Sequence, residues 1–272
     1  MQHIGTAALA GVLVLVWTLP LLWLISTAFK SRLDITSMPP KILPTPTIDN
    51  FKADYFGMDT AQLLRNSIVI AGLATGFTLA FSLPAAFGIA KSRPSVRTNL
   101  LVFLLSTRFA PPVALSVPYF FIVSALGLRG SFLAISVIHF VAGVSVATWI
   151  LVQQIDRLPR GLEISACIDG HTRAGAIWFV ILPNVLPGIA LAAALSFLLS
   201  WNEYLFASLL SSSATRPITP ALPSFLTQGA TRWGEFAAVA VIAAVPTLLL
   251  AIFVGRALAA GTSTAVRHRS NT

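Results

Sequence analysis

Six long apolar blocks, separated by shorter polar segments, dominate the sequence. A helix needs about 20 mostly apolar residues to cross a bilayer, and each block reaches that length. The pattern predicts membrane-spanning helices at residues 6–29, 66–90, 99–128, 131–155, 181–210 and 236–258. We therefore expect an all-α membrane protein with six transmembrane helices.

The overall composition supports a membrane protein over a soluble one. Hydrophobic residues make up 56% of the chain and charged residues 10%, whereas charged residues are about a quarter of a typical soluble domain. The mean hydropathy is +0.83. One soluble core cannot bury this much apolar surface.

The first apolar block is either a cleaved signal peptide or a retained helix. No basic segment precedes it, it is long, and no convincing small-x-small cleavage site comes before Lys30. We therefore expect residues 1–30 to form a retained first span. Residues 31–65 follow as an ordered extracytoplasmic loop, because prolines at 39, 40, 44 and 46 favour extended backbone. A short helix is expected within it at residues 48–56.

The net charge of +9 has two possible explanations. A nucleic-acid partner would need a cluster of Lys and Arg on a soluble element, which the sequence lacks. Basic loops facing an anionic cytoplasmic leaflet explain the charge better. The loops after the second and fourth blocks and the tail (residues 261–272) are basic, which predicts that both termini are cytoplasmic. The five Lys and Arg residues between positions 30 and 65 argue against this orientation.

Motifs for chemistry within the chain are missing from the sequence. No Gly-Lys dipeptide occurs, so a P-loop is absent, and no H-E-x-x-H motif occurs. The four histidines are scattered, and the single cysteine, Cys167, excludes an intrachain disulfide and a cysteine-rich zinc site. We expect no catalytic residues, no metal site and no cofactor bound by this chain.

The most informative segment is a polar interruption between the fourth and fifth blocks, here called the elbow (residues 158–178). Pro159 is expected to start a helix with Leu158, Leu162 and Ala166 on one face. Glu163 would lie in its first turn, where a carboxylate is favourable, and Asp169-Gly170 would end it. A second short helix is expected at residues 172–178. The alternative is an interfacial helix that only connects two spans.

The elbow also resembles the cytoplasmic signature of ABC importer permeases. That signature is a Glu-Ala-Ala triplet, a glycine four residues later, and Ile/Val-Leu-Pro at the next span. Ile164-Ser165-Ala166 occupies the triplet, Gly170 the glycine and Ile181-Leu182-Pro183 the ending. The longer stretch L-E-I-S-A-C-I-D-G is similar to L-E-E-A-A-x-I-D-G of carbohydrate-uptake permeases, as in the second membrane subunit of maltose-type and sugar-alcohol-type systems. Further similarities occur in order at residues 66–67, 84–88, 105–107, 111–112, 117–118, 201–203 and 260–266.

The resemblance implies a fold and a set of partners. The fold is a type I ABC importer permease, with residues 66–260 as a five-helix core and the elbow as its coupling helix. The partners are a second homologous permease in a heterodimer, two cytoplasmic ATP-binding subunits that hold ATP and Mg, and an extracytoplasmic solute-binding protein. The cargo is a sugar or sugar-like solute (a di- or oligosaccharide, a polyol or an amino sugar), and the location is the bacterial inner membrane.

The resemblance also implies which residues dock on the ATPase. They are Pro159, Leu162, Glu163, Ser165, Ala166, Asp169 and Gly170. The sequence departs from the family at Ile164, where the triplet has a glutamate that meets basic residues of the ATPase. Either Glu163 substitutes for that glutamate, or docking depends on Asp169 and apolar packing.

Ionisable residues within a membrane span indicate function by default. The mixture of amide, carboxylate and aromatic groups at residues 201–204 suits a sugar. The candidate substrate-pathway residues are Trp201, Asn202, Glu203, Tyr204, Arg108 and His139. For Glu203 the alternative is a structural pair, for instance with Arg108, and for His139 it is a hydrogen-bonded packing role.

Three rival functions remain from the sequence alone. One is the same permease fold with another cargo, such as a glycerophosphodiester. The second is a secondary transporter that works without an ATPase. The third is an intramembrane enzyme, which the missing motifs disfavour.

Overall fold

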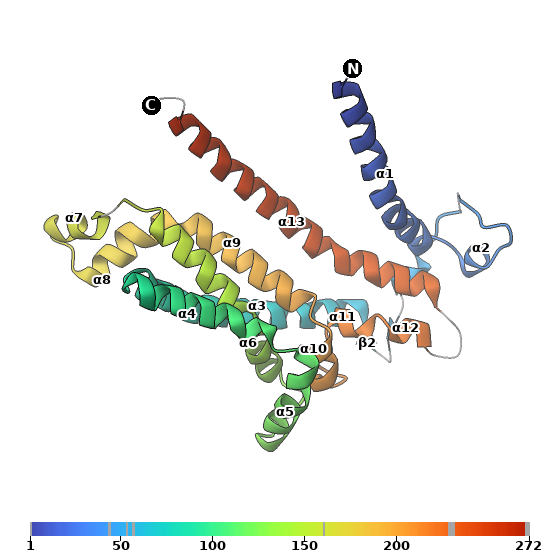
Figure 1. Ribbon diagram of the computed structural model, residues 1–272. Coiled ribbons are helices and arrows are strands. Elements are labelled where there is room, and N and C mark those ends of the chain that lie inside the picture. Colours follow the sequence, from blue (N-terminus) through green and yellow to red (C-terminus); the bar gives the residue numbers. More distant parts are fainter. Residues whose placement is uncertain are drawn as a thin grey trace. The chain divides into compact units, whose positions relative to one another are not determined.

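The computed structural model describes residues 2–42, 45–52, 54–55, 58–159, 161–227 and 232–269, and these are mostly helical (Figure 1). The chain divides into two compact units. The first combines residues 1–65 and 218–246, and the second combines residues 66–217 and 247–272.

The first unit holds the chain's start and several short elements. They are α1 (Gln2–Ala28), α2 (Arg32–Ile35), the 3-10 turn η1 (Asp49–Lys52), the two-residue antiparallel strands β1 (Asp54–Tyr55) and β2 (Met58–Asp59), α11 (Ile218–Ala221) and α12 (Ser224–Thr227). The expected helix at residues 48–56 is thus wrong beyond η1, because the chain becomes extended at Asp54. Ala53 and Phe56 lie outside the described residues.

The second unit holds most of the long helices. Two helices, α3 (Thr60–Ala90) and α13 (Trp233–Arg269), start in the first unit and continue into it. The others are α4 (Pro94–Ser106), η2 (Thr107–Phe109), α5 (Pro112–Ala125), α6 (Phe132–Asp156), α7 (Leu162–Ile168), α8 (Arg173–Gly175), the π-helical turn η3 (Ala176–Ile181), α9 (Leu182–Trp201) and α10 (Leu205–Leu210). Residues 270–272 of the expected tail lie outside the described part.

The expectation of six spans is confirmed, with one change in the third. Among the described residues, five helices are long and apolar enough to cross a membrane, and α4–η2 with α5 forms a sixth candidate that is bent by 87°. The bend lies at Ala110, whose backbone is extended before Pro111 and Pro112. Because a residue that precedes proline avoids the helical region, these two prolines end one half-helix and allow the next to start.

The fifth span begins and ends earlier than the sequence suggested. It runs from Arg173 to Trp201 through α8, η3 and α9, so the expected second helix of the elbow is continuous with the span. Thr172 caps its start by accepting a hydrogen bond from the backbone N–H of Gly175 at 3.1 Å. The helix stops at Asn202, and α10 is separate.

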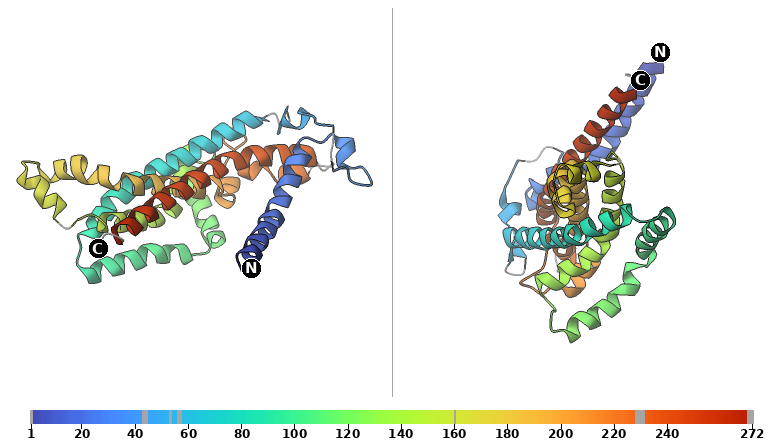
Figure 2. Two further views of the ribbon diagram at one scale, coloured as in Figure 1. Left: turned by 90° about the horizontal axis from the view of Figure 1, so that it is seen from above. Right: turned by 90° about the vertical axis from the view of Figure 1, so that its left-hand side faces the viewer.

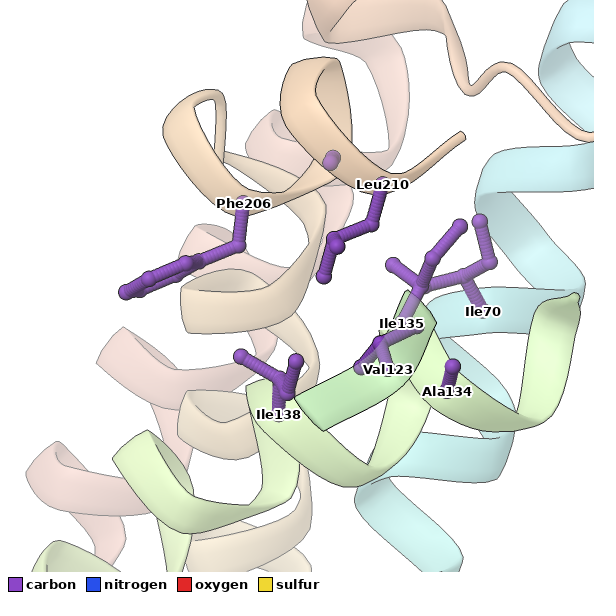
Figure 3. Close-up of a cluster of buried hydrophobic side chains, with 8 residues drawn as sticks. Ile70, Val123, Ala134, Ile135, Ile138, Phe206 and Leu210 are labelled. Carbon is purple, nitrogen blue, oxygen red and sulfur yellow. The ribbon is translucent and has the colours of Figure 1, made fainter. Parts of the chain in front are cut away.

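Helix α6 is the centre of the second unit and packs along α9. One core cluster joins α6 to α3, α5 and α10, as Figure 3 shows for Ile70, Val123, Ile135, Ile138 and Leu210. Small residues allow the helices to approach closely, as is typical of membrane bundles. Gly143 of α6 lies against Thr78 of α3, and a Cβ there would be 2.8 Å from the Thr78 hydroxyl oxygen.

The first unit is held together at the end of α1. Ala28 packs against Ala237 and Ala238 of α13. The side-chain amide of Asn50 donates hydrogen bonds to the carbonyls of Ala28 (2.9 Å) and Lys30 (2.7 Å). These bonds satisfy carbonyls that have no partner within the helix end, and they tie the loop to the span.

Replacing Gly143 with Val should destabilise the second unit, because the added side chain would overlap Thr78. Overpacking of this kind costs about 1–3 kcal/mol. Thermal unfolding of the purified protein in detergent measures the loss as a lower midpoint. Gly72→Val is the matched control, since a Cβ at Gly72 meets nothing within 4 Å. Equal midpoints for the two variants would contradict close packing at Gly143.

Candidate functional site

The first helix of the elbow, α7, is delimited by two glycines. Gly161 (φ +96°) precedes it and Gly170 (φ +95°) follows it, both in the left-handed region that favours glycine. At the end, the N–H of His171 bonds the carbonyl of Ala166 (3.0 Å) and the N–H of Gly170 bonds that of Cys167 (3.2 Å), which is a Schellman cap. The expected end at Asp169-Gly170 is confirmed.

The expected start of this helix at Pro159 is wrong. The helix begins at Leu162, because the left-handed backbone of Gly161 cannot continue into a right-handed helix. Pro159 precedes α7 in an irregular segment, and Arg160 lies outside the described residues.

The faces of α7 also differ from the expectation. Ala166 is buried, with 6% of its surface exposed, and Leu162 is partly buried. The outward face instead carries Ile164 (67% exposed) and Ile168 (80% exposed), one turn apart on the same side of the helix. The elbow therefore turns Leu162 and Ala166 toward the protein and presents an apolar pair, Ile164 and Ile168, to the outside.

Two ion pairs link the ends of four helices beside the elbow. The Lys91 ammonium lies 2.6 Å from the Glu163 carboxylate. Arg97 of α4 holds Asp156 of α6 with both terminal nitrogens, one of them at 2.8 Å. All four charged residues line a cavity of about 530 Å³ that also includes Pro159 and Leu162. Glu163 is thus occupied within the chain, by the residue that follows α3.

Figures 1 and 2 show where the elbow lies within the second unit. Helices α7 and α8 extend past the end of α6, at the end of the unit where α3 turns into α4. The polar elbow thus lies beyond the apolar bundle, while its ion pair with Lys91 joins it to the helix ends.

Glu203 lies at the break between α9 and α10 and satisfies the exposed backbone there. Its carboxylate accepts hydrogen bonds from the N–H groups of Phe206 and Ala207, both at 2.9 Å. The ring of His139 lies 3.0 Å from this carboxylate through Nε2, and 2.7 Å from the Ser200 hydroxyl through Nδ1. A polar chain therefore runs from Ser200 through His139 to Glu203.

The suggested pair of Glu203 with Arg108 is wrong. Arg108 donates a hydrogen bond to the carbonyl of Ala142 at 2.5 Å, and it lines a different cavity with Tyr119 and Phe206. The physical reason is proximity: the break after Trp201 lies beside α6, and His139 reaches it from there. The expected hydrogen-bonded role of His139 agrees with its hydrogen bond to Ser200 and its burial.

The candidate pathway residues thus form two groups. Trp201, Glu203 and His139 line one small cleft with Ser67, Ser200 and Pro217, and Arg108 lies elsewhere. Trp201 is buried and stacks on Phe197 at 5.6 Å, whereas Asn202 and Tyr204 are exposed. A pathway role for any of these residues stays a prediction.

Two residues that these sites use, Ser200 and Lys91, are not among the site residues that the sequence predicts. Ser200 is three positions before Glu203. A hydroxyl so near a carboxylate within an apolar block could have indicated that Ser200 belongs to the same polar site. Lys91 is the first polar residue after the second block, but nothing local indicates that it meets Glu163, 72 positions away.

Comparison with known proteins identifies the family. The model for the inner membrane component of binding-protein-dependent transport systems matches residues 72–264. The chain belongs to this family. It is a permease, the membrane translocation component of an ABC transporter.

Individual relatives cover nearly the whole permease. The sulfoquinovosyl glycerol transport system permease protein of Agrobacterium fabrum is 31% identical over 89% of this chain and 86% of its own. The trehalose transport system permease protein of Mycobacterium tuberculosis is 31% identical over 92% of each chain. The fold matches a chain of a bacterial ABC transporter involved in the import of alginate, with a TM-score of 0.74 and 18% sequence identity. The match covers 93% of this chain and 95% of that chain. The permease thus has the type I importer fold.

Reversing either charge of the Lys91–Glu163 pair should weaken transport. Glu163→Lys or Lys91→Glu alone places like charges at 2.6 Å, whereas the double exchange restores an attractive pair. An exposed ion pair contributes about 0.2–1 kcal/mol, and like charges lose at least that much. Solute uptake and thermal stability of the assembled transporter measure the effect. The double variant should recover most of the uptake and most of the thermal stability. If instead its losses equal the sum of the losses in the two single variants, the pair has no role.

Exchanging Glu203 for Gln should lower transport while the complex still assembles. Glutamine keeps a carbonyl oxygen for one of the two backbone N–H groups, but it removes the negative charge facing His139. Losing one cap hydrogen bond costs about 0.5–2 kcal/mol. Uptake assays combined with size-exclusion profiles separate the outcomes. Loss of assembly would instead assign Glu203 a purely structural role.

Proposed function

We propose that this permease is one of two membrane subunits of an ATP-driven, binding-protein-dependent importer for a sugar or sugar-like solute, with the elbow as its coupling helix. The observation that carries the proposal is α7: a short helix between two left-handed glycines, outside the bundle, with an outward apolar pair. The relatives that transport sulfoquinovosyl glycerol and trehalose support a carbohydrate cargo.

The elbow is suited to transmit movement because its parts are rigid and connected. In this proposal, ATP and Mg bind to partner subunits, whose closure displaces α7. Two routes lead from α7 into the bundle: the Glu163–Lys91 pair to α3, and the continuous backbone of α8, η3 and α9 into the fifth span. Rigid-body shifts travel through packed elements of this kind.

Docking on the ATPase would depend on apolar contact more than on charge. The family's triplet glutamate is Ile164 in this chain, and Glu163 is bound to Lys91. The remaining outward groups of α7 and its cap are Ile164, Ser165, Ile168 and Asp169, all exposed. Of the two explanations open from the sequence, this arrangement favours Asp169 and apolar packing.

The solute pathway is proposed to pass the broken spans. Non-helical backbone within a membrane is tolerated where it lines a cavity or is buried in protein, and transporters often bind solute at such breaks. The exposed Asn202 and Tyr204 lie at the break after α9, and together they offer an amide and an aromatic ring. A sugar presents hydroxyl groups and C–H faces that match these two groups.

The elbow's role also sets the proposed orientation. If α7 contacts ATPases in the cytoplasm, six crossings place both termini there and residues 31–65 outside the bacterial inner membrane. The solute-binding protein would then approach the extracytoplasmic side, and a homologous permease would complete the pathway in a heterodimer.

Replacing Ile168 with Glu should uncouple the permease from its ATPases, because an unpaired charge would enter an apolar contact. An uncompensated buried charge costs about 3–5 kcal/mol, which is at least about 100-fold in affinity. Co-purification of ATP-binding subunits measures docking, and ATPase stimulation by binding protein with candidate sugars measures coupling. Ser95→Glu, an exposed position in the first turn of α4, adds the same charge as a control and should leave both unchanged.

The same experiment separates the rival functions. A secondary transporter would co-purify with no nucleotide-binding subunit. A glycerophosphodiester importer would be stimulated by glycerophosphodiesters and not by di- or oligosaccharides, polyols or amino sugars. Full ATPase retention in the Ile168→Glu variant, together with intact uptake in Gly170→Pro, would overturn the role of the elbow.

A further inference from the structure

Lys30, which directly follows α1, is a buried lysine that pairs with no acidic residue in the described part of the chain. Only 2% of its surface is exposed. Its ammonium lies 4.1 Å from the centre of the Trp23 ring. Among the residues that the structure describes, no carboxylate lies within ion-pairing distance of it. Burying an ammonium without an opposite charge is costly, so such a residue indicates a missing anion.

The acid nearest in sequence does not fill this role. Asp34 is buried, but it accepts a hydrogen bond from the Lys41 ammonium at 2.5 Å. This bond holds the pKa of Asp34 below its ordinary value. Asp34 therefore stays ionised and neutralises Lys41, and the charge of Lys30 remains uncompensated.

Lys30 lines a cavity of about 400 Å³ within the first unit. Its walls are mostly apolar and aromatic, with Pro20, Trp23 and Leu24 from α1, and Trp233, Phe236 and Ala237 from α13. Thr27 and Thr36 add hydroxyl groups. Trp23 and Trp233 are about half exposed. Asp34 also lines the cavity, but its charge is neutralised by Lys41. Among the described residues, Lys30 therefore leaves this cavity with one uncompensated positive charge beside a large apolar surface.

The cavity lies where two membrane helices end, as Figure 1 shows for α1 and the start of α13. Tryptophan is enriched at the level of lipid headgroups, because its ring is apolar and its N–H is polar. The flank of α1 leading to the cavity is also apolar and exposed, at Leu13, Trp17 and Leu21 among others. Acyl chains can lie along such a flank while a headgroup occupies the cavity.

We propose that this cavity binds the headgroup of an anionic glycerophospholipid, with a singly charged phosphodiester against Lys30. A neutral sugar would leave the ammonium unpaired, and a free inorganic anion would leave the apolar walls uncovered. A phosphodiester with one negative charge, such as that of phosphatidylglycerol, matches the single positive charge and both kinds of surface. This site is independent of the elbow and of the solute pathway.

The test uses the assembled transporter in nanodiscs of phosphatidylcholine with a small fraction of phosphatidylglycerol. Native mass spectrometry counts the retained lipid, and titration with phosphatidylglycerol gives its affinity. The wild type should retain phosphatidylglycerol in preference to phosphatidylcholine. Lys30→Gln should weaken this binding at least about tenfold, whereas Lys30→Arg should keep most of it because the charge remains.

Lys52→Gln is the matched control. Lys52 lies in the same segment, but its side chain is 68% exposed and pairs with Asp49. The Lys52→Gln substitution removes the same charge as Lys30→Gln and should leave lipid retention unchanged. If Lys30→Gln does not assemble, Trp23→Leu provides a second variant that keeps the lysine, and it should also weaken binding.

Three results would overturn the proposal. An equal loss of phosphatidylglycerol binding in Lys30→Gln and Lys52→Gln would show only general attraction to an anionic membrane. Competition by millimolar inorganic phosphate would indicate a small-anion site instead. Loss of the partner permease from Lys30→Gln, with lipid retention unchanged, would show that an acidic side chain of that subunit occupies the cavity.

Discussion

A bilayer offers no hydrogen bonds to the backbone, and this constraint governs the second unit. Each interruption of a spanning helix must satisfy its own N–H and C=O groups from within the protein. After α9 the chain does so with Glu203, whose carboxylate accepts from two backbone N–H groups of α10. His139 in turn contacts that carboxylate, and a hydrogen bond to Ser200 helps to place the His139 ring. Glu203, an ionisable residue that looks functional in the sequence, is therefore also what makes the broken helix possible.

The break in the third span follows a different solution to the same constraint. Proline has no N–H to leave unsatisfied, and Pro111 and Pro112 occupy the corner between α4 and α5. The Arg108 side chain bonds the carbonyl of Ala142 on the neighbouring α6. Both broken spans therefore contact α6, the helix around which the second unit packs. A shift of α6 relative to either neighbour would change the contact that α6 makes with that neighbour's break.

The elbow shows how one substitution can redistribute an interaction. With isoleucine at position 164, the outward face of α7 becomes apolar, and the acid that remains beside it bonds Lys91. Charge at this site thus holds the elbow on the bundle, while the apolar surface of α7 faces away from it. The cavity at Lys30 has the opposite arrangement, because there the charge is what lacks an acidic partner among the residues that the structure describes.

The sequence by itself determined the features that depend on neighbouring residues. These are the six apolar blocks, the polar elbow, and the end of α7 at Gly170, because glycine tolerates a left-handed backbone better than other residues do. The sequence also contained the prolines that bend the third span, which was expected at residues 99–128. Only the tertiary structure decided which face of α7 is buried, that Glu163 meets Lys91, and that Glu203 meets His139 and not Arg108. These pairings join residues 64 to 72 positions apart. Spacing along a helix predicts which residues share a face, but the partner of that face depends on how the helices pack.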